Sequence, residues 1–383
     1  MDFSLSQEQK MLQETVRKFL QKELPRDKIR QLDEKDEPPL EVFNKMKALG
    51  LTGLTIAQEY GGAGPDILGA VLVLEEISKV SSSLGMVYLM SSFYGGANIS
   101  SNGSQEQKRR FLPELARGDL LFSYALTEPN AGSDAASAQT YAARDGHGFK
   151  LSGTKTLISG ADFADYILIL ARTDMDLPKH KCLSLFIIDQ KAPGLTINPI
   201  PKLGFKGSSI CEIVLEDVEA GPEDILGGPE CLNKGWGQVI STLGGEHLIS
   251  AALGVGLAQG VFDAALQYAK EREQFGRPIG SFQAIQHKLA EMITGVHTAR
   301  LLLYHSAWLM QQNIPHALES AMTKYYASET ARQVSLEAMR IFGGYGYTME
   351  YDVQRYVRDA LLLPLGAGSN EIQKNVMAKQ LGL

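Results

Sequence analysis

The sequence predicts an α+β fold with three consecutive regions: an all-α N-terminal domain over residues 1–120, a middle antiparallel β domain over 121–234, and a C-terminal four-helix bundle over 235–383. Three observations support this. Apolar residues recur at helical spacing in the first and last regions, and they follow strand spacing in the middle region. A chain of 383 residues is also too long for one simple core.

The first region opens with a helix-start signal. Ser6 and Gln9 have the spacing of a capping box. The apolar residues that follow share one helix face: Leu12, Val16, Phe19 and Leu20. A glycine-rich loop over 60–65 precedes a second apolar helix, expected over 68–80.

The middle region has the pattern of strands separated by glycine and proline turns. Strands are expected over 149–152, 166–170, 183–188 and 210–218. Because strand follows strand without helical patterns between them, we expect an antiparallel sheet rather than a doubly wound one.

Long helical patterns return after Gly235. We expect helices over 236–273, 281–312, 315–343 and 350–363, then a short terminal helix. Their lengths suit an antiparallel bundle. The glycines of the segment 254–260 do not have the spacing of the dinucleotide fingerprint, because the last one lies too far along the chain. No strand is expected before this segment either. Its small residues instead predict close helix packing.

Composition excludes several classes of function. With 44% hydrophobic and 21% charged residues, the chain is expected to be soluble and globular. No apolar stretch of about 18 residues is expected to span a membrane, and no secretory signal is expected at the N-terminus. Three widely spaced cysteines without histidine partners predict free thiols, no metal site and a cytoplasmic location. The basic run 108–110 predicts a solvated helix face, so no nucleic-acid partner is expected.

A loop over 124–134 combines hydroxyls, glycine and proline between the first two regions. Such a loop offers N–H groups and hydroxyls to a phosphate or a polar ring edge. On spacing alone, an ordinary interdomain turn is the commoner explanation.

A carboxylate and a glycine-rich turn stand out in the last region. Glu246 follows Gly244 and Gly245 and precedes the apolar run 248–252, and a turn over 366–369 leads into the terminal helix. By default such a glutamate is a first-turn residue stabilised by the helix dipole. A partly buried carboxylate can instead serve as a general base, because desolvation raises its pKa.

Several segments together resemble the acyl-CoA dehydrogenase family, and they occur in the family's order along nearly the whole chain. They are the loop 124–134 and the segments 60–62, 153–159, 216–218, 272–276, 341–347, 358–360 and 368–373. The resemblance implies an FAD-dependent enzyme with an α domain, a β domain and an α bundle. It also implies a homotetramer that acts on an acyl-CoA and passes electrons to an electron-transfer flavoprotein.

Family positions map onto individual residues of this chain. The implied FAD contacts are Tyr124, Leu126, Thr127, Gly132, Ser133, Leu157, Ile158, Ser159, Arg272, Gln283, Gly343, Gly344, Ser369 and Glu371. The implied substrate contacts are Ser133, His247 and Gly368. Arg272 would reach the FAD of a neighbouring subunit, although a salt bridge with Glu271 or Glu273 is the alternative. For the glycine pair, a helix C-cap is the alternative.

The resemblance also bears on the catalytic base. Most family members carry the base at the position of Ala367, whereas isovaleryl-CoA dehydrogenase carries it at the position of Glu246. Glu246 is therefore expected to remove the α-proton of the thioester. Ala367 keeps a backbone N–H that can polarise the thioester oxygen.

Three positions depart from the family pattern: His247 replaces an arginine, Gly244 an aspartate and Leu157 a tryptophan. His247 could be cationic or neutral, which would affect the pH dependence of activity. Small residues at 366 and 367 leave room for a branched, alicyclic or aryl-bearing acyl group, and residues 88–94 are candidates for lining it. The sequence fixes no direction, so an enoyl-CoA reductase is an alternative, and a non-redox acyl-CoA-binding protein is a third.

Overall fold

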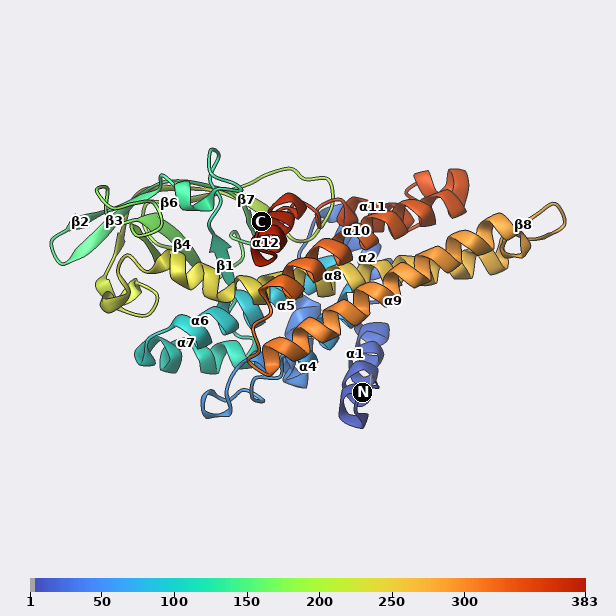
Figure 1. The fold of residues 1–383 in the computed structure, drawn as a ribbon, viewed down its shortest axis with the longest axis horizontal. Coiled ribbons are helices and arrows are strands. Elements are labelled where there is room, and N and C mark those ends of the chain that lie inside the picture. Colours follow the sequence, from blue (N-terminus) through green and yellow to red (C-terminus); the bar gives the residue numbers. More distant parts are fainter. Residues whose placement is uncertain (1–3) are drawn as a thin grey trace.

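The computed structural model describes residues 4–383, and its helical, β and helical regions follow one another as expected (Figure 1). The N-terminal helices are α1 Gln7–Glu23, α2 Arg26–Lys35, α3 Leu40–Met46, α4 Ile67–Ser78, α5 Ser82–Leu89, α6 Asn98–Asn102 and α7 Gln105–Arg117. A π-helix, Met90–Ala97, separates α5 from α6. The predicted capping box at Ser6 and Gln9 is confirmed. Helix α4 is apolar and buried along almost its whole length, as expected of a helix at the centre of a core.

The middle region is a seven-stranded sheet of β1 Phe122–Ala125, β2 Tyr141–Asp145, β3 Gly148–Ser159, β4 Tyr166–Arg172, β5 Leu183–Asp189, β6 Leu195–Pro199 and β7 Ile210–Ala220. Most pairs are antiparallel, as predicted, but β1 runs parallel to β4, with Phe122 opposite Tyr166. β1 enters directly from the helical region, so it has no hairpin partner. β3 pairs with β7 through two register shifts, one of them between Lys155 and Ile158.

The last region contains α8 Gly235–Glu271, α9 Gln283–Gln311, α10 Ala317–Phe342, α11 Val353–Ala360 and α12 Asn370–Gln380. A small hairpin, β8 Glu273–Gln274 and β9 Arg277–Pro278, projects beyond the ends of α8 and α9 (Figure 1). The helices α8, α9 and α10 pack against one another, and α4 lies against α8 and α9.

Helix α8 is long and apolar enough to cross a membrane, so the expectation that no such stretch exists was wrong. Within the described chain it is a core helix, with 78% of its most apolar window buried. Its glycines permit this packing: a Cβ on Gly256 would lie 2.3 Å from the Glu75 carbonyl oxygen, and one on Gly260 would lie 2.1 Å from that of Lys79. The predicted role of these small residues in helix packing is confirmed.

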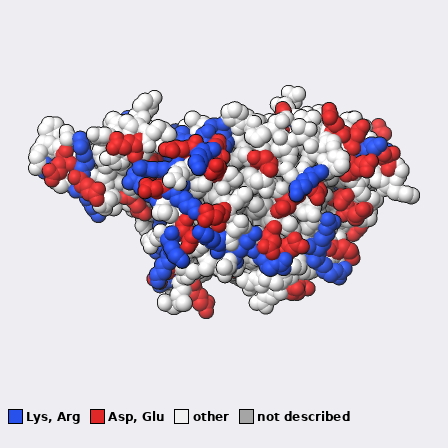
Figure 2. Space-filling model, turned by 180° about the vertical axis from the view of Figure 1, so that it is seen from behind, with Lys and Arg blue, Asp and Glu red and all other residues white. Residues whose placement is uncertain are grey.

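Charged side chains of both signs are interspersed over the face shown in Figure 2. In the basic run 108–110, Arg109 pairs with Glu106 at 3.1 Å. Arg110 lies over the Phe111 ring at 4.6 Å, and its Nη2 donates to the Tyr166 hydroxyl at 3.4 Å. Both arginines of this run therefore contact neighbouring side chains of the same chain.

Candidate active site

Glu246 lies about three turns inside α8, because the helix begins at Gly235. The interpretation of Glu246 as a first-turn glutamate is therefore wrong. A carboxylate this far from the helix start gains little from the unpaired N–H groups there. The burial and the pKa of the Glu246 carboxyl must therefore be set by the elements that pack around α8.

Protein surrounds the Glu246 carboxyl as densely as in the interior, although the side chain keeps a partly exposed surface. Such a group lies in a recess rather than on an open face. Burial raises the pKa of Glu246 from 4.5 to about 7, and the positive charge of Lys324 opposes this rise. Burial is thus the larger effect.

Two tyrosines accompany Glu246. Tyr94, from the π-helix, and Tyr124, from β1, have ring centroids 5.9 Å apart. Burial raises the pKa of both phenols, and the nearby charge of Glu246 contributes to both shifts. The Tyr124 hydroxyl is buried without a well-formed hydrogen bond, although Thr242 lies nearby. Of the residues expected to line the acyl site, Tyr88 is fully buried, and its hydroxyl donates to the Leu51 carbonyl at 3.1 Å.

The turn 366–369, here called the Ala367 turn, leads into α12. Ala367 and Gly368 both have left-handed backbones, with φ of 52° and 72°. A side chain at positive φ is strained, so surrounding contacts must hold this shape. Ser369 caps α12 by accepting a hydrogen bond from Ile372 N at 3.4 Å.

Two buried side chains donate to carbonyls of the Ala367 turn. Lys324 Nζ, from α10, lies 2.7 Å from the Gly368 oxygen and 3.1 Å from Asn370 Oδ1. Gln373 Nε2 lies 3.1 Å from the Gly368 oxygen and 3.4 Å from the Ala367 oxygen. The same nitrogen is 3.1 Å from His247 Nε2, which connects the turn to the helix that carries Glu246.

His247 is 3% exposed, and its observed partner is Gln373. Burial lowers its pKa from 6.5 to about 4, with a smaller contribution from Lys324. The lowered pKa favours the neutral imidazole at physiological pH, which is one of the two states that the sequence allowed. Its expected contact with substrate stays a prediction.

The loop that follows β1 is fixed by a buried ion pair. Lys155 Nζ, on β3, lies 2.9 Å from Glu128 Oε1 and 3.1 Å from the Leu126 oxygen. Glu128 also accepts from the N–H groups of Gln139 and Thr140. The backbone at Leu126 and Thr127, expected to contact FAD, is thereby tied to the sheet, since Thr156 N donates to the Thr127 oxygen at 3.0 Å.

β3 presents an exposed apolar side chain beside this loop. Leu157 is 57% exposed and has φ of 59°, at the second register shift between β3 and β7. Ile158 is buried and Ser159 is partly buried. Gly132 and Ser133 are exposed on the neighbouring loop. An exposed leucine beside free backbone and hydroxyl groups fits one face and one edge of a planar polar ring, as in a flavin.

The remaining predicted FAD contacts lie elsewhere. Arg272 ends α8, 26 residues beyond Glu246 or about 39 Å along the helix. Arg272, Gly343 and Gly344 line a cavity of about 460 Å³, and Gln283 begins α9 nearby. Within residues 4–383, Arg272 forms no ion pair with Glu271 or Glu273, and it lies over the Tyr345 ring at 5.6 Å. Gly343 is the C-cap of α10.

This second group suits a pyrophosphate. An exposed guanidinium faces glycine backbone at which an added Cβ would meet nothing within 4 Å. The structure brings Ser369 and Glu371 near the Glu246 side of the molecule, at the start of α12. It does not bring Arg272, Gln283, Gly343 and Gly344 there, and β8 and β3 lie at opposite ends of Figure 1.

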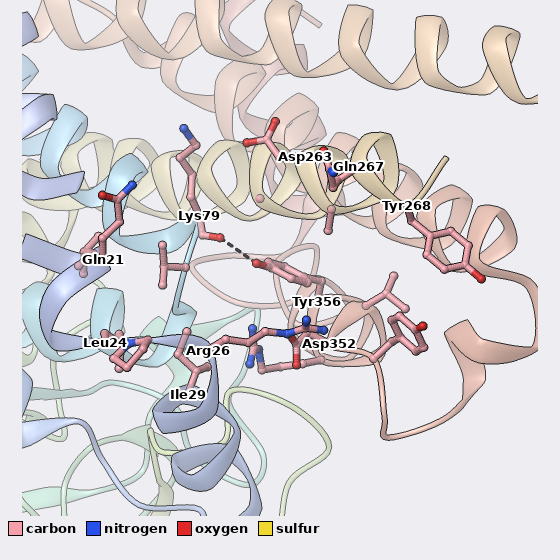
Figure 3. Close-up of a pocket in the computed structure, with 18 of the residues that line it drawn as sticks. Gln21, Leu24, Arg26, Ile29, Lys79, Asp263, Gln267, Tyr268, Asp352 and Tyr356 are labelled. Carbon is pink, nitrogen blue, oxygen red and sulfur yellow. Dashed lines mark hydrogen bonds and ion pairs between the residues drawn. The ribbon is translucent and has the colours of Figure 1, made fainter. Parts of the chain in front are cut away.

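A larger cavity adjoins the second group, because Tyr268 and Phe342 line both cavities. It measures about 690 Å³ between α1, α2, α8 and α11, and none of the predicted site residues lines it (Figure 3). Arg17 pairs with Glu76 and Arg26 with Asp352 on its walls. The Tyr356 hydroxyl donates to the Lys79 oxygen at 2.9 Å. No group of three metal-binding side chains was found among residues 4–383.

Sequence reasoning gave no role to Lys155, Lys324 or Gln373. Lys155 lies within the segment 153–159 and is fully buried on β3. Lys324 falls on the buried face of α10 with Ala321, Ala327 and Ala331. A lysine on an apolar helix face was the available signal.

Three domain descriptions match the chain. "Acyl-CoA dehydrogenase, N-terminal domain" matches residues 6–119, "middle domain" 123–218 and "C-terminal domain" 233–382. A relative named "Probable acyl-CoA dehydrogenase YngJ", from Bacillus subtilis, is 42% identical over all of both chains. "Caffeyl-CoA reductase-Etf complex subunit CarC", from Acetobacterium woodii, is 37% identical over 98% of each chain. A solved "FAD complex of PigA" is 30% identical, with a TM-score of 0.93 and full coverage of both chains.

Proposed function

This chain belongs to the acyl-CoA dehydrogenase family of FAD-dependent oxidoreductases, and we propose that it converts an acyl-CoA thioester to the 2-enoyl-CoA with Glu246 as the base. The observation that carries this proposal is the setting of Glu246. Its pKa of about 7 suits a base at neutral pH, because the carboxylate is available and still basic.

The residues of this chain divide the chemistry between them. Glu246 takes the α-proton through a carboxylate oxygen. The Ala367 N–H donates to the thioester oxygen, which gains negative charge as the proton leaves. Bound FAD supplies the acceptor for the hydride that leaves the β-carbon. Tyr94 and Tyr124 cover the carboxyl and keep it desolvated, which maintains its basicity.

Substrate placement draws on Ser133 and Gly368, both exposed beside the flavin loop and the Ala367 turn. The glycines and alanine around the base support a branched, alicyclic or short acyl group. Electron-transfer flavoprotein is the proposed electron acceptor, and the Etf complex named for the Acetobacterium woodii relative supports this. A cytoplasmic location completes the proposal.

A second copy of the chain is needed to complete the FAD site. The residues around β1 and β3 suit the isoalloxazine ring, whereas Arg272, Gln283, Gly343 and Gly344 suit the pyrophosphate. About 39 Å of α8 separates Glu246 from Arg272. We therefore place the second group on the FAD of a neighbouring copy, within a homotetramer.

A reductase running the same chemistry in reverse is the second candidate, and the Acetobacterium woodii relative named a caffeyl-CoA reductase favours it. The same base and donor serve both directions, because Glu246 protonated at its carboxyl can return a proton to the α-carbon. The direction depends on the partner and on the redox potential of the bound flavin.

Anaerobic titration tests the proposal. The FAD-loaded protein is mixed with isovaleryl-, butyryl-, cyclohexanecarboxyl- and 3-phenylpropionyl-CoA while flavin absorbance is followed. Loss of the oxidised-flavin band with at least one of them is expected. The chemically reduced protein is then mixed with the matching 2-enoyl-CoAs, and faster reoxidation than reduction would favour the reductase. A colourless protein that does not take up FAD would support a non-redox acyl-CoA-binding protein instead.

A further inference from the structure

The Ala367 turn has a conformation that its own sequence does not stabilise. Ala367 has φ of 52°, where a Cβ crowds the following carbonyl and strains the backbone. The next residue, Gly368, is also left-handed. Contacts from outside the turn must therefore hold it, and they set the direction of the Ala367 N–H.

Side chains from α10 and α12 supply those contacts, and both donate to the same carbonyl oxygen. Lys324 Nζ and Gln373 Nε2 both donate to the Gly368 oxygen, at 2.7 and 3.1 Å. Lys324 and Gln373 are both fully buried. With their carbonyl ends held, the peptides of the turn have little freedom to rotate.

Gln373 also fixes the position of the turn relative to α8, the helix that carries Glu246. Its nitrogen faces the carbonyls of Ala367 and Gly368, so the amide orientation is set by these two acceptors. The same nitrogen must then donate to His247 Nε2, 3.1 Å away, and neutral His247 carries its proton on Nδ1. His247 adjoins Glu246 in α8, so one amide links the base helix to the turn.

Lys324 has more charge than its contacts neutralise. Within residues 4–383 it forms no ion pair, and its two acceptors are the Gly368 carbonyl and the Asn370 amide. A buried ammonium without a carboxylate partner is costly. Glu246, Glu329 and Glu371 act on it from a distance, and it acts in turn on Glu246 and His247. Lys324 therefore places a positive charge at the Gly368 carbonyl, close enough to Glu246 to oppose the rise in the pKa of that base.

We propose that Lys324 and the His247–Gln373 pair form a positioning clamp that fixes the Ala367 turn relative to Glu246. The clamp orients the Ala367 N–H toward the thioester oxygen, and the ammonium stabilises the negative charge that develops there. This inference rests on the proposed function, because it assigns roles within the same site. It makes Lys324 and Gln373 positioning residues, and it gives His247 a role in the clamp through its hydrogen bond with Gln373.

The test compares Lys324→Met and Gln373→Leu with a matched control, Ser328→Ala. Ser328 Oγ donates to Asn370 Oδ1 at 2.9 Å, so the control removes a buried hydrogen bond of the same network without touching the turn. Flavin reduction is followed by anaerobic stopped flow at saturating isovaleryl- or butyryl-CoA. FAD content and melting temperature report on folding.

Both clamp variants are expected to slow flavin reduction about 10- to 100-fold, which is the scale for a displaced oxyanion donor. Their apparent substrate affinity should change less than about threefold, because ground-state contacts remain. The bound thioester should show a weaker shift of its carbonyl stretching band than in the unaltered enzyme. Ser328→Ala should lose comparable stability but keep its reduction rate within about twofold. Because Lys324 and Gln373 hold the same oxygen, the double variant should lose less than the product of the single losses.

Other outcomes separate the clamp from the proposed function. Equal rate losses in Ser328→Ala and the clamp variants, or an unchanged carbonyl band, would overturn the clamp and leave the base assignment intact. If Lys324→Met does not fold, His247→Leu and Gln373→Leu still test the arm formed by the His247–Gln373 pair. If no acyl-CoA reduces the flavin, hydrogen exchange over residues 362–372 still tests the clamp. Unchanged exchange in Gln373→Leu would then overturn it.

Discussion

Replacing Glu246 with glutamine should abolish catalysis and stabilise the protein above neutral pH. The pKa of Glu246 is about 7 when folded and 4.5 ordinarily. That difference of about 2.5 units corresponds to roughly 3 kcal/mol at 1.36 kcal/mol per unit. Because the folded pKa is the higher one, the folded state binds more protons between these values. Its stability therefore falls as pH rises from about 4.5 to 7.

Glutamine keeps the shape of the protonated acid and cannot ionise. Glu246→Gln should therefore match the parent below about pH 4.5 and gain up to roughly 3 kcal/mol of stability above pH 7. Catalysis should change in the opposite sense. In the parent, the ionised fraction of Glu246 rises from about one tenth at pH 6 to about nine tenths at pH 8, so flavin reduction should accelerate roughly tenfold. The variant should be at least about 100-fold slower at both pH values.

The assay measures melting temperature and anaerobic flavin reduction from pH 5 to pH 9. Asp263→Asn is the matched control, because Asp263 is an exposed acid on the same helix and hydrogen-bonds Gln259 at 2.7 Å. The control should show the parent's pH dependence in both measurements. A Glu246→Gln variant that bleaches at full speed, or whose melting temperature follows the parent's at every pH, would refute the reasoning.

Three further predictions concern the base position, the flavin loop and the core. Adding Ala367→Glu to Glu246→Gln should restore part of the flavin bleaching by moving the carboxylate to the turn, and stopped flow with butyryl-CoA would detect it; no recovery would mean that the turn cannot present a base. Lys155→Met should weaken FAD retention by about 10-fold or more, measured by fluorescence of released FAD, because it leaves Glu128 buried without its cation; unchanged retention would show that the loop holds its shape alone. Gly256→Ala should lower the melting temperature sharply, since its Cβ would meet the Glu75 oxygen at 2.3 Å, whereas Gly237→Ala, whose Cβ would meet nothing within 4 Å, should not.

The helices were predictable because each carries a long periodic signal. The predicted helix 315–343 became α10 Ala317–Phe342, and 236–273 became α8 Gly235–Glu271. Strands of the buried sheet were found where apolar runs are continuous, as in β4 and β5. The parallel pairing of β1 with β4 was not predictable, because β1 has four residues and its partner lies more than 40 residues later.

The base was predictable in identity but not in setting. Its position in the sequence suggested a first turn, because Gly244 and Gly245 resemble a break before a helix. In the structure both glycines lie inside α8, where Gly244 faces His316 and Gly245 faces Met310. Tertiary packing overrode the local signal, and the environment of Glu246 is set by residues of α10, β1 and the π-helix.

The features that local rules fail to predict gather around the proposed chemistry. Ala367 and Leu157 hold left-handed backbones, Lys324 and Lys155 are buried cations, and Glu246 is a partly exposed acid whose pKa is raised by burial. Each is costly by itself, and the two lysines also fix segments that are expected to touch substrate or flavin. Lys155 holds the loop that follows β1, and Lys324 holds the Ala367 turn. Burying the charges of Lys155 and Lys324 is costly, and a fixed geometry of the site is what this cost maintains. The clamp variants measure that link directly, because a cost retained only for stability would leave the rate of flavin reduction unchanged.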